Sequence, residues 1–274
     1  MDSTYKLGWL PDLPDARDIP FRAVFRVPRA LPSRCDLRAG CSAVEEQGEL
    51  GSCTAQALVG ALEYLELGAL ADGRRASCYR DLSRLFVYFN EREAMGTVRE
   101  DSGAMLRVGI KTLAKQGVCA ETLWPYDVSR FARRPAAACY EEARGHSITA
   151  YQRLTSVAEM KACLAQGLPF VFGFSVYEHV MSRQVARTGV IRLPEPNERL
   201  QGGHAVLAVG YDDERQTVLF RNSWGEGWGR DGYGELPYGY LSDRNLSDDF
   251  WCIQATSSDA YAWRRSPAKP GAVA

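Results

Sequence analysis

Three side chains in this sequence have the types and surroundings that nucleophilic acyl transfer requires. Cys53 ends the segment Gln47–Cys53 (QGELGSC), His204 follows two glycines, and Asn222 begins the segment NSWG. A thiol nucleophile needs a base, and the base needs a third group that orients it. Cysteine, histidine and asparagine can fill these roles in that order. The sequence therefore predicts a catalytic set made of these three residues.

The position of Cys53 favours its reactive form. Residues 53–67 repeat their apolar side chains with the spacing of an amphipathic helix, namely Leu58, Ala61, Leu62 and Leu65. A cysteine in the first turn of a helix faces free backbone N–H groups and the positive end of the helix dipole. Both stabilise a thiolate. A single cysteine at a helix start is more often a small packed residue. The presence of His204 and Asn222 in the same sequence favours a nucleophile.

His204 and Asn222 are expected to meet across a hairpin. Residues 204–211 and 217–222 are rich in β-branched and aromatic side chains and flank a polar loop. If the two strands pair symmetrically about Asp213, Tyr211 opposes Arg215 and His204 opposes Asn222. Directly opposed residues have Cβ atoms about 4.5–5.5 Å apart. The asparagine amide would then hold one imidazole nitrogen and leave the other for the thiol. This register is an assumption, because a one-residue slip reverses the faces. The alternative is a core histidine beside an unrelated asparagine.

The order of the predicted elements indicates an α+β fold. Helical patterns at residues 53–67, 82–89 and 105–113 come first, and strand patterns at 169–177, 204–211 and 217–222 follow. Residues 1–32 contain five prolines and little periodicity, which predicts an extended arm. Residues 257–274 are small and polar, and we expect them to be disordered.

Composition excludes several classes of partner. The 274 residues are 46% hydrophobic and 24% charged, with a formal net charge of −1. This balance gives no reason to expect binding to nucleic acid or to an anionic membrane. The first residues lack the apolar core of a signal peptide, and no run approaches the roughly 18 apolar residues of a spanning helix. We expect a cytoplasmic monomer, with signal-independent secretion left open.

The eight cysteines do not form a recognisable metal or disulfide pattern. They are widely spread, no CxxC occurs, and the three histidines do not have zinc-ligand spacing. We expect no metal site, and most of the cysteines should be buried thiols. Cys35 and Cys41 are near enough in sequence to bridge, but their spacing leaves that pairing open.

Three sequence blocks together resemble the signatures of papain-like cysteine peptidases. QGxxGSC precedes a helix, GGHAV surrounds His204, and NSWGxxWGxxGY runs from Asn222 to Tyr233. The resemblance covers about residues 36–241. It implies a catalytic domain at 33–256 with two lobes and the active-site cleft between them. The helical lobe would span about 45–130, and an antiparallel, β-barrel-like lobe about 131–256.

The resemblance also implies roles for individual residues. The Cys53 thiolate would attack a peptide carbonyl, His204 would protonate the leaving amine, and water would hydrolyse the thioester. The Gln47 amide and the backbone N–H of Cys53 would form the oxyanion hole. Trp224 would shield the bond between His204 and Asn222 from water. No metal or organic cofactor is implied.

Substrate binding is implied at Ser102, Gly103 and Gly203. The tripeptide Asp101–Gly103 resembles the segment whose glycine lets a substrate backbone pair beside the cleft, although such a tripeptide could also be an ordinary turn. The implied partner is a peptide or protein substrate. Endopeptidase activity is the default, because we find no histidine pair of the kind that makes some relatives dipeptidases.

Two positions depart from the lysosomal and plant members of the family. Leu50 stands where those members have a cysteine, and Thr54 where they have an aromatic residue. The first difference removes half of a common disulfide, which fits a reducing compartment. Leu50 also brings the sequence nearer to the bacterial, xylellain-like branch.

Two alternatives and one hypothesis accompany this interpretation. The same fold could be a catalytically silent binding protein, or the same three residues could transfer the acyl group to an amine, as an acyltransferase or transpeptidase does. The long helical pro-region of many relatives is missing before Asp36. We therefore hypothesise that the arm, residues 1–32, covers the cleft; an arm that is merely tethered is the competing possibility.

Overall fold

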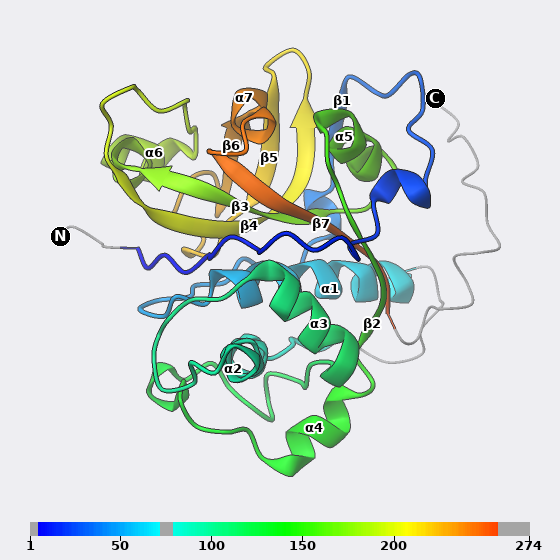
Figure 1. Ribbon diagram of the computed structural model, residues 1–274, viewed down its shortest axis with the longest axis vertical. Helices are drawn as coiled ribbons and strands as arrows, with labels where there is room; N and C mark the ends of the chain where they lie inside the picture. Colours follow the sequence, from blue (N-terminus) through cyan, green and yellow to red (C-terminus); the bar gives the residue numbers. More distant parts are fainter. Residues whose placement is uncertain (1–4, 72–78, 257–274) are drawn as a thin grey trace.

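The computed structural model describes residues 5–71 and 79–256, which form a helical half and a sheet half (Figure 1). The helical half contains α1 (Cys53–Ala71), α2 (Arg84–Met95), α3 (Leu106–Gln116) and α4 (Ala137–Ala143). The arm runs between the two halves as the dark blue segment. The α+β class is confirmed. The tail expected to be disordered, 257–274, lies outside the described residues.

The sheet is antiparallel and open. Its order is β2 (Ile148–Arg153), β7 (Ser247–Thr256), β3 (Phe170–Tyr177), β4 (Leu200–Asp212), β5 (Thr217–Arg221) and β6 (Tyr233–Pro237), with β1 (Arg34–Asp36) added beside β4. Within the described residues the path runs from β2 to β6 without closing. The lobe predicted to be barrel-like is thus an open, antiparallel sheet.

Both faces of this sheet are buried, which explains its nearly continuous apolar strands. Successive side chains of a strand point to opposite faces. On β4, Leu207 belongs to the core shared with α1 to α3, whereas Val206 and Ala208 belong to the second core. That second core is covered by α5 (Val157–Ala165), α6 (Arg183–Thr188) and α7 (Tyr238–Ser242). The strands therefore show no alternation of apolar and polar residues in the sequence, because both faces of the sheet need apolar side chains.

The three predicted helices are present and begin within two residues of the expected positions, but they end three to six residues later than expected. α2 begins after Ser83, whose hydroxyl accepts a hydrogen bond from the backbone N–H of Phe86, and it ends at Gly96 in the left-handed region. The part of the chain that the structure describes also contains four short 3₁₀ helices, at Phe21–Ala23, Arg38–Gly40, Val128–Arg130 and Glu178–Met181. In residues 5–71 and 79–256, none of the helices is both long enough and apolar enough to cross a membrane.

The helical half extends further along the chain than the expected limit at residue 130. Cys139 and Ala143 of α4 are buried in the core that contains Leu58 and Trp124, and Figure 1 shows α4 beside the other helices. The sequence changes character at the loop after Trp124. This change marks the end of one group of helices and not the end of the lobe.

The predicted register of the β4–β5 hairpin is wrong. Leu207 pairs with Arg221, which excludes His204 as the direct partner of Asn222. His204 instead pairs with Phe174 on the other side of β4.

Local turn chemistry explains the error. The loop is Asp213–Gln216, one residue longer than assumed, and Gln216 has a left-handed backbone with φ of 55°. The Asp212 carboxylate accepts hydrogen bonds from the backbone N–H groups of Glu214 and Arg215. β4 also bulges near its centre, which shifts the pairing again. Neither effect is visible in apolar periodicity.

Cys35 and Cys41 do not bridge. Both are free thiols, and so are the other cysteines in the described part of the chain. The Cys35 thiol donates to the carbonyl of Leu164 at 3.2 Å, and the Cys41 thiol lies 3.7 Å from the carbonyl of Leu37.

Candidate active site

The structure brings His204 and Asn222 together despite the different register. The imidazole Nε2 and the amide Oδ1 are 2.7 Å apart, and the same oxygen accepts the backbone N–H of Ser223 at 2.8 Å. Continuing the β4–β5 pairing would set Asn222 opposite Val206, so His204 lies diagonally across on the same face. The amide oxygen is held from both sides, which fixes the orientation of the ring.

The other imidazole nitrogen is available for chemistry. Within residues 5–71 and 79–256, Nδ1 of His204 is buried and has no hydrogen-bond partner. Burial lowers the pKa of His204 to about 4, and the hydrogen bond with Asn222 opposes this shift. The ring is therefore neutral at neutral pH in this conformation and can accept a proton at Nδ1.

Two aromatic rings cover the imidazole. Trp224 stacks on His204 with ring centroids 4.4 Å apart, and Tyr5 of the arm stacks on Trp224 at 4.3 Å. Trp224 thus lies where it can shield the imidazole–amide hydrogen bond. The arm adds a second layer on top of it.

Cys53 is the first residue of α1 and is fully buried. Burial raises the pKa of its thiol to about 12, while the backbone N–H groups of Ala205, Gly8 and Thr54 favour the thiolate and oppose the rise. Ala205 directly follows His204, so the sulfur lies against the strand that carries the imidazole. In this conformation the thiol is protonated, because its burial disfavours the charged thiolate.

Gln47 is fully buried and has both ends of its amide engaged. Its Oε1 accepts from the hydroxyl of Ser223 at 2.7 Å, and its Nε2 donates to the carbonyls of Leu50 at 2.8 Å and of Lys6 at 3.1 Å. The backbone N–H of Ser223 also donates to the Asn222 amide, so Ser223 links Gln47 to Asn222. Sequence reasoning assigned no role to Ser223, although it lies inside the NSWG block.

The arm forms backbone hydrogen bonds with both halves of the molecule. The N–H groups of Gly8 and Trp9 both donate to the carbonyl of Gly203 at 3.0 Å. On the helical side, Ala104 donates to the Gly8 carbonyl at 2.8 Å, and Leu10 donates to the Ala104 carbonyl at 2.9 Å. Residues 8–10 thus bridge the two halves directly beside Cys53.

Where residues 8–10 of the arm pass between the two halves, close packing requires glycine. A Cβ atom on Gly8 would lie 1.9 Å from the carbonyl oxygen of Gly51, and one on Gly103 would lie 2.1 Å from the carbonyl oxygen of Gly8. Gly103, with φ of 71°, is also in the left-handed region. Of the three residues predicted to bind substrate, Gly103 and Gly203 face the arm. The hydroxyl of Ser102 bonds instead to Thr97 and to the Gly103 carbonyl in its own loop.

Beyond the crossing, a group of charged residues holds the arm. We call it the Asp12 clamp; it consists of Asp12, Asp18, Arg107, Arg153, Asp248 and Asp249. The buried Asp12 carboxylate accepts from the backbone N–H of Arg107 and from the indole N–H of Trp251, both at 3.0 Å. The backbone N–H of Asp12 donates to Asp249 at 2.7 Å.

Two arginines complete the clamp. Arg107 donates to Asp18 at 3.0 and 2.5 Å, and Arg153 contacts Asp18 at 3.3 Å. Arg153 also donates to Asp248 at 2.8 Å and to Asp249 at 2.9 Å. Four carboxyl groups thus share two guanidinium groups. Burial raises the pKa of Asp12, and burial together with the charge of Asp12 raises the pKa of Asp249 to about 7.

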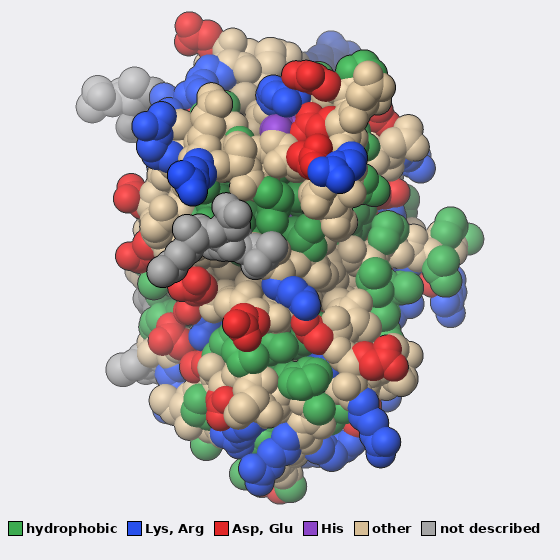
Figure 2. All heavy atoms as spheres, turned by 90° about the vertical axis from the view of Figure 1, so that its left-hand side faces the viewer, with side chains coloured by type: hydrophobic (Ala, Val, Ile, Leu, Met, Phe, Trp, Pro, Cys, Tyr) green, Lys and Arg blue, Asp and Glu red, His purple; other side chains and the backbone are tan. Residues whose placement is uncertain are grey.

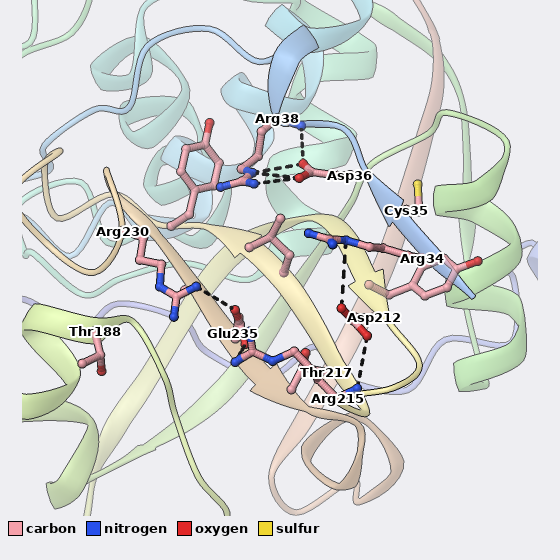
Figure 3. A pocket seen from close by; sticks show the side chains of 14 residues that line it. Arg34, Cys35, Asp36, Arg38, Thr188, Asp212, Arg215, Thr217, Arg230 and Glu235 are labelled. Carbon is pink, nitrogen blue, oxygen red and sulfur yellow. Dashed lines mark hydrogen bonds and ion pairs between the residues drawn. The ribbon is translucent and has the colours of Figure 1, made fainter. Parts of the chain in front are cut away.

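A separate pocket lies among β1, β4, β5 and β6 (Figure 3), away from Cys53 and His204. Its four arginines all have carboxylate partners: Arg34 with Asp212, Arg38 with Asp36, and Arg215 and Arg230 with Glu235. Its positive charge is therefore locally compensated. On the face drawn in Figure 2, Lys and Arg side chains likewise lie among Asp and Glu side chains.

Comparison with known sequences identifies relatives over most of the chain. A family model described as papain family cysteine protease matches residues 31–247. An uncharacterized peptidase C1-like protein of Acanthamoeba polyphaga mimivirus is 37% identical over 272 residues, which cover 90% of this chain and 86% of that protein. A cathepsin B-like protein of Giardia intestinalis is 30% identical over 203 residues, which cover 69% of this chain and 62% of that protein.

Solved structures agree with this relationship. The crystal structure of xylellain, a cysteine protease from Xylella fastidiosa, is 41% identical in sequence and has a TM-score of 0.82, with 92% of this chain and 97% of that chain covered. Digestive procathepsin L 3 of Tenebrio molitor larval midgut is 19% identical with a TM-score of 0.67, over 93% of this chain and 77% of that chain. The second similarity concerns the fold alone.

Proposed function

Because this chain belongs to the papain family of cysteine proteases, we propose that it is an endopeptidase whose cleft is occupied by residues 5–10 of its own arm. The observation that carries the proposal is the 2.7 Å contact between His204 and Asn222. The backbone N–H of Ala205, the residue after His204, is one of the groups that favour the Cys53 thiolate. This arrangement supports a site in which Cys53 is the nucleophile, His204 the base and Asn222 the orienting group.

The proposed reaction proceeds through a thioester. Cys53 loses its proton to Nδ1 of His204, and the sulfur attacks the substrate carbonyl carbon. The carbon–nitrogen bond then breaks as His204 returns the proton to the leaving amine. Water, deprotonated by His204, hydrolyses the thioester and regenerates the thiol. Asn222 keeps the ring oriented throughout.

Gln47 supports this scheme as a donor to the developing oxyanion. Its Nε2 already binds a carbonyl oxygen in the cleft, that of Lys6. With the arm withdrawn, the same N–H group would be available to a substrate carbonyl, together with the backbone N–H of Cys53. Donors that are held in place before the reaction are effective, because they need no reorganisation as charge develops.

The path of the arm supports an endopeptidase. Tyr5 stacks above the imidazole side of the site, and Leu10 pairs with Ala104 past Cys53 on the helical side. The arm therefore occupies the cleft on both sides of the nucleophile. A cleft that accepts a continuous chain on both sides can bind the interior of a polypeptide.

The arm is better suited to inhibit than to be cleaved. At the point nearest the nucleophile, the N–H of Gly8 donates to the Gly203 carbonyl, and the Gly8 carbonyl accepts from the N–H of Ala104. The Gly8 carbonyl is thus bound to the helical half, whereas a substrate would have to present its carbonyl carbon to the Cys53 sulfur. The arm also buries both reactive groups, which keeps the thiol protonated.

A peptide blocked at both ends tests this function. The full-length Gly8→Val variant, whose arm should be displaced, is expected to cut such a peptide internally, and mass spectrometry would identify the two products. The same variant carrying Cys53→Ala should give no products. Cleavage that persists without Cys53, or removal of terminal residues only from unblocked peptides, would contradict the proposal.

A further inference from the structure

A tryptophan of the arm fills a slot that two glycines leave open. Trp9 is 7% exposed, although it lies on the arm. A Cβ atom on Gly173 of β3 would lie 1.9 Å from the indole, and one on Gly203 of β4 would lie 2.7 Å from it. Any larger residue at either position would therefore occupy the space of the ring. We call this space the Trp9 slot.

A buried carboxylate is directed at the indole from the inner end of the slot. Oδ2 of Asp249 accepts the indole N–H of Trp9 at 3.0 Å and the backbone N–H of Asp12 at 2.7 Å. Its Oδ1 accepts from Arg153 at 2.9 Å. Asp249 is fully buried and has a left-handed backbone, with φ of 59°. Such a conformation is costly for a non-glycine residue and persists only where the surroundings impose it.

The slot opens beside the nucleophile, where a substrate must pass. The residue before Trp9 is Gly8, which packs against the carbonyl group of Gly51, two residues before Cys53. The backbone groups that hold this part of the arm, the carbonyl of Gly203 and the N–H of Ala104, belong to the body of the protein and stay when the arm leaves. A substrate backbone bound to the same groups would carry a side chain over the slot.

Withdrawal of the arm changes what the slot can bind. Both donors to Oδ2 of Asp249 come from the arm, so this oxygen loses them together. The charges left at the clamp are those of Arg107, Arg153, Asp248 and Asp249, which balance. A cationic side chain therefore meets no excess of negative charge. A flat ring with a neutral N–H group can pack between the two glycines and donate a hydrogen bond to the Asp249 carboxylate.

Building on the proposed peptidase function, we propose that the Trp9 slot binds a tryptophan side chain of the substrate and that Asp249 is the residue that selects it. Phenylalanine or leucine can fill the space but leaves Oδ2 of Asp249 without a donor. A site built to hydrogen-bond a substrate N–H group discriminates strongly against analogues that lack it. The arm thus holds the cleft with the side chain that the slot recognises.

The slot can be tested in the full-length chain without catalysis. Trp9→Ala leaves the space of the indole empty, and calorimetry would compare 3-methylindole with 3-methylbenzothiophene, which has nearly the same shape but no N–H group. We expect 3-methylindole to bind at least about tenfold more tightly, since the bond involves a charged acceptor. Wild type, whose slot is filled, should bind neither.

Variants of two adjacent carboxylates provide the control. In Asp249→Asn, Arg153 keeps the amide oxygen on its side, so the amide nitrogen faces the slot and the preference for the indole should vanish. Asparagine also tolerates the left-handed backbone at this position. Asp248→Asn should keep the preference, because Asp248 binds Arg153 without contacting Trp9. Equal affinity for the two compounds, no binding of either, or a preference that survives Asp249→Asn would each overturn the proposal.

Turnover then separates this inference from the proposed function. Full-length Gly8→Val would be given peptides that differ only in carrying tryptophan or its benzothienyl analogue at one residue. We expect kcat/KM to be at least about tenfold higher for tryptophan. Equal kcat/KM values would overturn substrate selection and leave the peptidase function intact. If neither peptide is cleaved but Trp9→Ala still prefers 3-methylindole, the peptidase function would be contradicted. The selectivity of the slot would then stand.

Discussion

Two stretches of the arm are held by different physical means. Residues 5–10 lie in the cleft and are fixed chiefly by backbone hydrogen bonds and by close packing around Gly8. Residues 11–18 are fixed by carboxylates buried against Arg107, Arg153 and Trp251. The first attachment depends on shape and the second on charge. Each can therefore be weakened by its own variants, and the response to pH should come from the carboxyl groups of the second stretch and from Asp249, which also accepts the indole N–H of Trp9.

The largest effect is expected from Gln47, which serves both the arm and the reaction. Gln47→Ala removes the donor to the Lys6 carbonyl and the proposed donor to the oxyanion. In the Gly8→Val background we expect kcat to fall by about 10²–10³, the loss typical of one oxyanion-hole donor. Steady-state kinetics with a fluorogenic peptide would measure it. A fall of less than about threefold would show that Gln47 does not stabilise the transition state.

Breaking the cleft attachment should activate the full-length protein. Valine at residue 8 cannot fit, because its Cβ atom would lie 1.9 Å from the Gly51 carbonyl oxygen. Such overpacking costs about 1–3 kcal/mol, which corresponds to roughly a 5- to 150-fold larger population of open arm. Initial rates of peptide cleavage should rise accordingly. Ala16→Val, in an exposed part of the arm, is the control and should leave the rate unchanged.

Breaking the charged attachment should activate less. Asp12→Ala removes the acceptor for the backbone of Arg107 and for the indole of Trp251, so we expect about a tenfold rise in rate. Asp15→Ala is the matched control on the same arm, because its partners Arg17 and Lys111 are exposed. Exposed ion pairs contribute little. Equal activation by both variants would show that the clamp has no special role.

The smallest expected effect is the dependence of arm docking, and thus of inhibition, on pH. Burial raises the pKa of Asp12 in the docked arm, and burial together with the charge of the docked Asp12 raises the pKa of Asp249 to about 7, whereas a free aspartate titrates near 3.8. The docked state therefore binds more protons. Its stabilisation is complete below about pH 4, is lost as pH rises toward about 7, and is constant above that.

The ratio of wild-type to Gly8→Val activity would report this dependence. Taking the ratio at each pH removes the titration of Cys53 and His204, which both proteins share. We expect the ratio to rise several-fold between about pH 5 and 7 and then to level off. Asp249→Asn should flatten the curve. A ratio that falls as pH rises would contradict the assignment of the buried carboxyl groups.

The catalytic set could be predicted from sequence because its signals are local. Cys53 lies at a helix start, His204 lies on β4, and Asn222 directly follows the neighbouring strand β5, each in a distinctive block. The geometry behind their contact could not be predicted. It depends on the Asp212 side chain capping a four-residue loop and on a bulge in β4, and these two shifts replace the expected direct pairing by a diagonal one.

The path of the arm was beyond sequence reasoning for a different reason. The composition of residues 11–18 indicates a stiff acidic segment, but the partners of Asp12 are Arg107, Trp251 and Asp249, which are roughly 95 to 240 residues away in the chain. Contacts at such separation follow from the complete fold. The short helix α4 was missed likewise, because its few turns carry too little periodicity to be recognised.

The most direct test of the account is the rate at which an irreversible thiol-directed epoxide labels each cysteine. We predict that Gly8→Val is labelled at Cys53 at least about fivefold faster than wild type, in line with the larger population of open arm. Peptide mapping by mass spectrometry should find no label at that position in Cys53→Ala. Equal labelling rates in the two full-length proteins, or labelling confined to another cysteine, would contradict a nucleophile sheltered by its own arm.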